Sequence, residues 1–117
     1  MVVWGTGKPC REFLHVDDLA EACLHLLELE APPDWVNVGV GEDVSIAELA
    51  DKVKSAIGYT GTIKFDTSKP DGTPRKFLDV SRMKDLGWVA GIPMDEGIAS
   101  TYRSFLREQE ATGLRAR

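Results

Sequence analysis

Long apolar runs are missing from this sequence. No run of eighteen apolar residues occurs in the 117 positions, and no basic segment followed by an apolar one opens the chain. These absences argue against a helical membrane span and a secretory leader, so we expect a cytoplasmic protein without a membrane partner. Cysteine is scarce: Cys10 and Cys23 lie outside any CxxC motif, so we expect two free thiols and no metal site.

Positive charge is also in short supply. The chain carries 14 Lys and Arg against 19 Asp and Glu, for a net charge of −5. A duplex nucleic acid requires a broad basic face, so we expect no nucleic-acid partner. An anionic ligand would have to be bound locally. Two short segments gather cations: SKPDGTPRK, residues 68–76, with Lys69, Arg75 and Lys76, and the loop with Lys8 and Arg11.

The length and the order of predicted elements define the fold class. A chain of this size fits one unit, residues 1–117. Strands are expected at 1–4, 12–16, 35–39, 62–67 and 77–80. Helices are expected at 18–30, 45–57, 81–86 and from about 93, with a frayed tail at 111–117. This alternation predicts an α/β protein, although five such short strands do not complete a doubly wound sheet.

The first predicted helix combines a start signal with an apolar stripe. Asp18 and Glu21 have the spacing of a capping box. The stripe, expected to be buried, consists of Val16, Leu19, Ala20, Cys23, Leu26 and Leu27. His25 falls off this stripe and is expected in solvent. Ser45 and Glu48 form the equivalent capping box of the second helix, which Gly58 ends.

Candidate catalytic groups are few. GTG at 5–7 and GVGED at 39–43 lack the pattern of a dinucleotide-binding loop, and we expect turns there. Neither Tyr59 nor Tyr102 is followed by a lysine four residues later, as a reductase proton donor would be. His15 beside Asp17 is expected to make a local hydrogen bond, with a general base as the alternative. The sequence therefore predicts no self-sufficient active site.

Anion binding is better supported. Arg11 offers a planar fork for a phosphate and Lys76 a compact charge. In SKPDGTPRK, two prolines fix φ, Gly72 permits a turn, and Asp71 can bond its own turn, so the loop loses little entropy on binding. Three alternatives stay open. The segment could be a solvated turn and not a site, and Trp4 could lie in the core or stack on a base or sugar. The Cys10 thiol could be packed or reactive.

Three segments carry a family resemblance: VVWGTGKPCREFLHVDDLAEA, WVNVGVGEDVSIAELADKV and FDTSKPDGTPRKFLDVSRMKDLGW. Together they resemble the carboxy-terminal part of the GDP-L-fucose synthases. These enzymes are 3,5-epimerase/4-reductases that act on GDP-4-keto-6-deoxy-D-mannose. They are extended short-chain dehydrogenases/reductases and belong to the NAD-dependent epimerase/dehydratase family. Two of the motifs are typical of the extended short-chain dehydrogenases/reductases in general: R-E-F-L-H-V-x-D and N-V-G-x-G. K-P-D-G-T-P-R-K, followed by L-D-V-S-R, is narrower and points to the fucose synthases.

The resemblance implies substrate-binding roles for three residues, and it implies that the cofactor is bound by a different part of the enzyme. Trp4, Arg11 and Lys76 match positions that contact the GDP-sugar. It implies NADPH as cofactor and a homodimeric parent enzyme. The GxxGxxG motif and the reductase and epimerase residues are not in this sequence, so we expect an incomplete Rossmann-type fold, a substrate-binding portion without the NADP-binding half, that is inactive alone. The alternatives are a piece of another nucleotide-sugar epimerase, dehydratase or reductase, and a non-catalytic interaction fragment.

Overall fold

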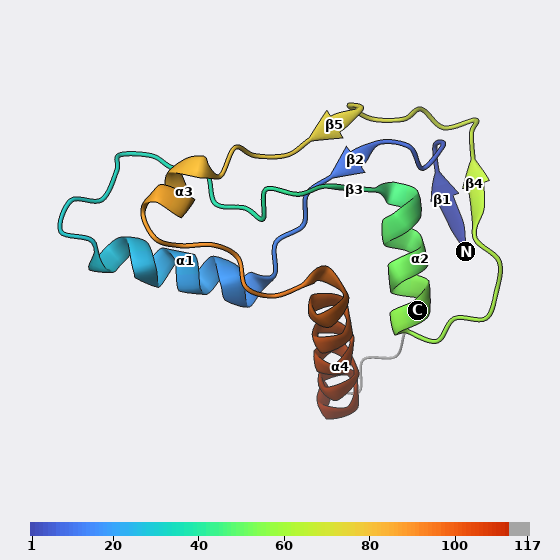
Figure 1. Ribbon diagram of the computed structural model, residues 1–117. Helices are drawn as coiled ribbons and strands as arrows, with labels where there is room; N and C mark the ends of the chain where they lie inside the picture. The colour runs from blue at the N-terminus through green and yellow to red at the C-terminus, as the bar shows by residue number, and fades with distance from the viewer. Residues whose placement is uncertain (113–117) are drawn as a thin grey trace.

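The computed structural model describes residues 1–112 and confirms the α/β class (Figure 1). In chain order its elements are β1 (Val2–Trp4), β2 (Cys10–Arg11), α1 (Val16–Glu28), β3 (Val44–Ser45), α2 (Ile46–Ala56), β4 (Lys64–Asp66), β5 (Arg75–Lys76), α3 (Ser81–Asp85) and α4 (Met94–Thr112). None of these helices is long and apolar enough to span a bilayer. Of the tail predicted at 111–117, residues 111 and 112 continue α4, and 113–117 lie outside the described residues.

The strands form two small sheets. In the first, β1 pairs in parallel with β4, and Trp4 is opposite Asp66. In the second, the order is β3-β2-β5, so β2 is central, antiparallel to β3 and parallel to β5. Figure 1 shows the second sheet near the middle of the molecule, between α2 and the arm that carries α1 and α3.

Three predicted strands are wrong. Residues 12–15 form no strand: the strand lies just before them, at Cys10–Arg11, and only the Glu12 amide continues its pairing, with the Lys76 carbonyl. Residues 77–80 are also unpaired, because the amide of Leu78 donates to the Glu12 carboxylate rather than to a strand. Residues 35–39 have an alternating pattern but no neighbouring strand within 1–112. A strand requires a partner for its backbone groups, so the pattern alone does not produce one.

The start of α1 differs from the predicted capping box. His15 is the N-cap, and its Nδ1 accepts a hydrogen bond from the Asp17 amide at 3.2 Å. Asp18 is instead 2% exposed and accepts from the amides of Gly91 and Ile92, at 3.1 and 3.0 Å. A carboxylate taken out of water needs such donors, so Asp18 ties α1 to the segment before α4.

The second and third helices follow the sequence closely. Ser45 and Glu48 form both halves of the capping box of α2, and Gly58 follows the helix with φ +66°. In α3, Met83 is buried, and Gly87 ends the segment with φ +88°. Trp88 packs against Met83 and Ala22, and this cluster is the centre of the core.

Most of the predicted stripe of α1 is exposed, and within it only Leu26 packs, partly buried, against the core. Only Asp18 and Ala22 of this helix are buried. The exposed large apolar residues here are Val16 at 68%, Leu19 at 44%, Leu24 at 63%, Leu27 at 80% and, beyond the helix, Trp35 at 73%. Cys23 is exposed as well, so its predicted core position is wrong. His25, predicted in solvent, bonds the Leu86 carbonyl at 2.8 Å because α1 turns that face toward α3.

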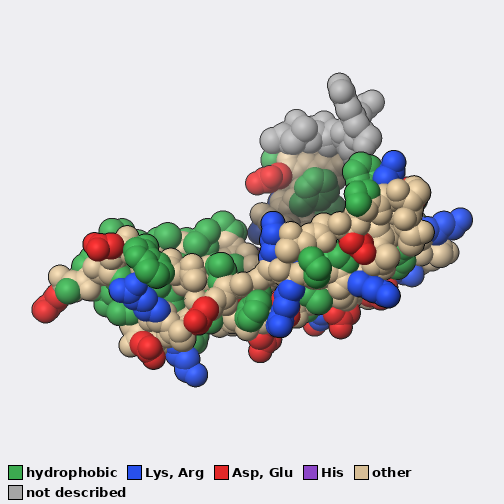
Figure 2. All heavy atoms as spheres, turned by 90° about the horizontal axis from the view of Figure 1, so that it is seen from above, with side chains coloured by type: hydrophobic (Ala, Val, Ile, Leu, Met, Phe, Trp, Pro, Cys, Tyr) green, Lys and Arg blue, Asp and Glu red, His purple; other side chains and the backbone are tan. Residues whose placement is uncertain are grey.

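The whole molecule is elongated. Its extents are 51 × 38 × 19 Å and its radius of gyration is 17.1 Å, against about 13 Å for a compact chain of this length. In Figure 2, hydrophobic side chains are exposed along much of the visible face, and basic and acidic side chains are interspersed. The described residues thus share a small core and leave apolar surface uncovered.

Candidate functional site

The pairing of β2 with β5 brings two predicted site residues together. Arg11 and Lys76 are register partners in this parallel pair. Partners in register point to the same face of a sheet, so the two cationic side chains are neighbours although 65 positions separate them. The sequence predicted both residues, and the structure supplies their juxtaposition.

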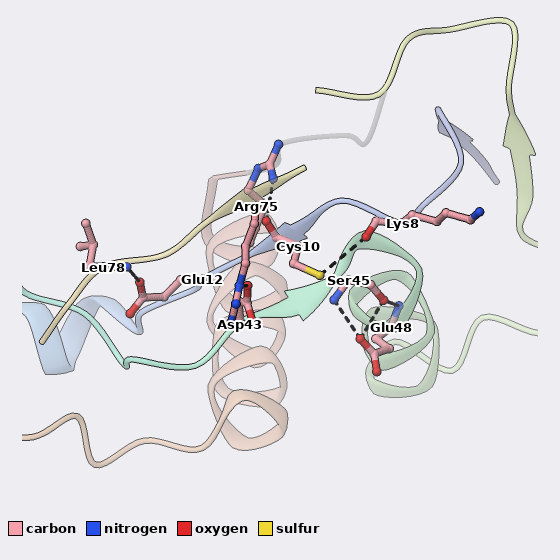
Figure 3. A network of polar contacts seen from close by, with 9 residues as sticks. Lys8, Cys10, Glu12, Asp43, Ser45, Glu48, Arg75 and Leu78 are labelled. Carbon is pink, nitrogen blue, oxygen red and sulfur yellow. Dashed lines mark hydrogen bonds and ion pairs between the residues drawn. The ribbon is translucent and has the colours of Figure 1, made fainter. Parts of the chain in front are cut away.

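The chain around Lys76 is held by backbone and side-chain bonds. The Cys10 amide donates to the Pro74 carbonyl at 2.8 Å, and the Glu12 amide to the Lys76 carbonyl at 3.3 Å. One oxygen of Glu12 accepts from the Leu78 amide at 2.7 Å (Figure 3). Its other oxygen accepts from the amides of residues 40 and 41. Glu12 therefore joins β2, β5 and the turn before β3, a role that no local pattern in the sequence indicated.

Arg75, next to Lys76, is engaged with a carboxylate. Its Nε and Nη2 donate to the two oxygens of Asp43 at 2.6 and 3.1 Å. Its guanidinium also lies over the Phe77 ring, 4.3 Å from the centroid. The hydrogen bond and the charge of Arg75 hold the pKa of Asp43 below its ordinary value of 3.8, and Asp43 raises the pKa of Arg75. Arg75 thus shapes the site instead of offering a free charge.

The SKPDGTPRK segment contacts the two N-terminal segments that carry the other candidate site residues, Trp4 and Arg11. Asp71 accepts from the amide and the hydroxyl of Thr6, at 2.7 and 2.6 Å, rather than from its own turn as predicted. Lys69 lies 5.6 Å from the centroid of the Trp4 ring. A Cβ at Gly72 would lie 3.1 Å from Nη2 of Arg11. Gly72 has no positive φ, so its part here is close approach to Arg11 and not the predicted turn conformation.

Trp4 lies apart from the two cations. It belongs to the sheet of β1 and β4, whereas Arg11 and Lys76 belong to the other sheet. Its side chain is 72% exposed, so the alternative of a core position is wrong. The 68–76 segment links Trp4 with the cations. Its Lys69 lies over the Trp4 ring, and its Gly72 closely approaches the Arg11 guanidinium.

A cleft of about 730 Å³ opens beside β5. Its lining residues are Glu12, Leu14, Val38, Gly39, Arg75, Lys76, Phe77 and Leu78. This volume falls in the range of small-molecule sites. The walls are mainly apolar, and Glu12, Arg75 and Lys76 are the charged residues among those that line them.

The remaining candidates have structural contacts. His15, in addition to capping α1, places Nε2 3.1 Å from the Ser100 hydroxyl, which itself donates to the Gly97 carbonyl. This is the local bonding predicted in place of a general base. Cys10 donates from Sγ to the Lys8 carbonyl at 3.6 Å and is partly buried. Within residues 1–112 no cluster of three His, Cys, Asp or Glu has metal-binding geometry.

Two cations therefore keep hydrogen-bonding capacity toward a ligand. Lys76 is exposed and makes no ion pair within residues 1–112. Arg11 donates from Nη1 to the Cys10 carbonyl at 2.6 Å, which fixes its guanidinium without neutralising it. A planar fork and a compact ammonium on adjacent strands suit an anion with several oxygens, such as a diphosphate.

Comparisons with known proteins confirm the resemblance seen in the sequence. Residues 1–39 match the NAD dependent epimerase/dehydratase family. GDP-L-fucose synthase of Escherichia coli (strain K12) is 50% identical over 94% of this chain and 37% of its own length. GDP-L-fucose synthase 1 of Arabidopsis thaliana is 49% identical over 92% of this chain and 33% of its own length. The chain thus spans about a third of the length of these curated relatives.

Solved structures agree in fold. A GDP-L-fucose synthetase from Naegleria fowleri bound to NADP superposes with a TM-score of 0.82 at 33% identity, over 93% of this chain and 35% of that one. A UDP-glucose 4-epimerase from Thermotoga maritima also gives 0.82, at 24% identity, over 92% and 35%. The second likeness shows the fold alone.

Proposed function

Because this chain is similar over nearly its whole length to part of the GDP-L-fucose synthases of the NAD dependent epimerase/dehydratase family, we propose that it supplies the GDP-sugar-binding part of such an enzyme. The reaction is the 3,5-epimerisation and NADPH-dependent 4-reduction of GDP-4-keto-6-deoxy-D-mannose to GDP-L-fucose, in a cytoplasmic homodimeric enzyme. The observation that carries the proposal is the register pairing of Arg11 with Lys76.

Arg11 and Lys76 bind the diphosphate in this proposal. Arg11 presents its fork from β2 and Lys76 its ammonium from β5, so both contact oxygens of the same group. In this proposal the cleft beside Lys76 receives the nucleoside or the sugar that extends from that diphosphate. Trp4 is exposed at the far end of the 68–76 segment and can stack on a ring there.

The cofactor and the chemical step belong to residues outside this sequence. The chain has no GxxGxxG motif and no tyrosine with a lysine four residues later. The uncovered apolar face of α1 and the unpaired 35–39 segment support the same division, because each is suited to contact a further part of a protein. We propose that the cofactor-binding part covers both.

Replacing Lys76 tests the proposed site. Calorimetric titration of GDP into the chain should show binding, and Lys76→Ala should weaken it roughly tenfold or more, because a charge-assisted bond is lost. Lys84→Ala is the matched control, since it removes an exposed lysine from α3. Circular dichroism of both variants should match the parent chain. Equal GDP affinity in the parent and in Lys76→Ala would remove Lys76 from the site.

A further inference from the structure

The position of Lys76 depends on a very short strand. β5 contains only Arg75 and Lys76, and besides its ladder with β2 the pairing includes the flanking bonds from the Cys10 amide to the Pro74 carbonyl at 2.8 Å and from the Glu12 amide to the Lys76 carbonyl at 3.3 Å. The preceding anchor of the 68–76 segment is Asp71, four positions before Arg75. Pairing this short is marginal without side-chain support. Side-chain contacts that tie β5 to the rest of the sheet would therefore help to keep Lys76 beside Arg11.

The Asp43–Arg75 ion pair spans the central strand. Asp43 directly precedes β3, Arg75 belongs to β5, and β2 lies between them in the sheet order. Cys10 of β2 is the register partner of both Ser45 and Arg75, so the Arg75 side chain passes β2 on its way to Asp43 (Figure 3). The pair thus connects the two edge strands of a three-stranded sheet.

We propose that Asp43 is a positioning residue that, through Arg75, holds β5 in register with β2 and so keeps Lys76 beside Arg11 for the diphosphate. This inference rests on the proposed function. The Asp43 side chain is 12% exposed, and both its oxygens bind the guanidinium. A bidentate pair fixes direction as well as distance, which a single contact cannot do. The Glu12 bond to Leu78 anchors the other side of Lys76.

A rival role for the same residues makes the opposite prediction. Arg75 lines the cleft, and Asp43 could simply withhold it from the anion. Removing the Asp43 charge would then release Arg75 and also remove a repulsive carboxylate, and both effects would tighten anion binding. A positioning role predicts weaker binding instead, so the sign of the change separates the two.

Asp43→Asn, measured in the whole chain, is the test, with Glu42→Gln as the matched control. Glu42 is the exposed neighbouring carboxylate, so this variant makes the same charge change beside the pair. We expect Asp43→Asn to bind GDP roughly fivefold to tenfold more weakly and Glu42→Gln to bind as the parent does. Arg75→Lys, which keeps the charge but loses the fork, should fall between them.

Amide hydrogen exchange supplies a second readout that does not need GDP. In Asp43→Asn the Cys10 and Glu12 amides, which donate to Pro74 and Lys76, should exchange faster. The Trp88 amide, bonded to the Met83 carbonyl, should keep its protection and so show that the core is intact. Unchanged exchange at Cys10 and Glu12, or GDP binding as tight as in the parent, would overturn the positioning role. Failure of the proposed function gives a different result: GDP would not bind the unsubstituted chain. The exchange measurement does not use GDP, so it would still test whether Asp43 holds β5 beside β2.

Discussion

At the scale of single residues, carboxylates organise the candidate site. Glu12 accepts from three backbone amides, Asp43 from the Arg75 guanidinium, and Asp71 from Thr6. For Asp43 and Asp71 these bonds favour the ionised carboxylate and hold the pKa below its ordinary value of 3.8. Acidic residues therefore hold the backbone around the cationic residues Arg11 and Lys76. A chain of net charge −5 can in this way offer a local anion-binding site.

Protonation should release the loop anchored by Asp71. The hydrogen bonds from the side chain and amide of Thr6 lower the pKa of Asp71 below its ordinary value of 3.8. A carboxyl group with a lowered pKa in the folded state contributes stability above pH 3.8, and the contribution is lost as the pH falls through the lower value. The Thr6 amide resonance should therefore hold steady down to pH 3.8 and shift with a midpoint below it.

Nuclear magnetic resonance during acid titration measures this midpoint. Asp71→Asn is the control, because the amide cannot titrate and the step at Thr6 should disappear. A Thr6 midpoint at or above 3.8 in the parent chain would contradict the bond between Thr6 and the Asp71 carboxylate.

At the scale of elements, helices were predictable where their signals are local. The Ser45–Glu48 capping box and the glycine after α2 fixed that helix almost to the residue. α3 and α4 also lie close to the helices predicted at 81–86 and from about 93. The cap of α1 was not predicted, because Asp18 serves a contact 73 positions away and His15 takes its place. Local patterns cannot show such distant partners.

Strands were predictable only where both partners lie in the chain. The strands at β1 and β4 appear as expected, and they pair with each other. The 35–39 segment has the right alternation but no partner within 1–112, and it stays unpaired. Arg11 and Lys76 were identified by charge type and by family resemblance, whereas their register and the roles of Glu12 and Asp43 required the structure.

At the scale of the whole molecule, an elongated shape accompanies a small core. Among the described residues, Ala22, Ala50, Met83 and Trp88 form the buried hydrophobic set, whereas most of the apolar side chains of α1 remain in solvent. A surface of this kind normally contacts another part of a protein. Such a surface, in a chain that spans about a third of its relatives' length, agrees with the proposal that this chain binds the substrate and another part binds the cofactor.

This division predicts that the 117 residues do not use NADPH. Titration of the chain into NADPH, followed by the cofactor's fluorescence, should show no saturable change, because no dinucleotide-binding loop is present in the sequence. Addition of GDP-4-keto-6-deoxy-D-mannose should produce no NADPH oxidation. Either saturable binding or turnover by this chain would show that the cofactor site lies within it.

The central claim is that a nucleotide diphosphate binds where β2 meets β5. The most direct test is to titrate GDP into the isotope-labelled chain and to map which backbone amide resonances move. We predict saturable shifts concentrated at residues 10–12 and 74–78, on the strands that carry Arg11 and Lys76, with α4 unaffected. No shifts at all, or shifts centred on α4, would contradict the account.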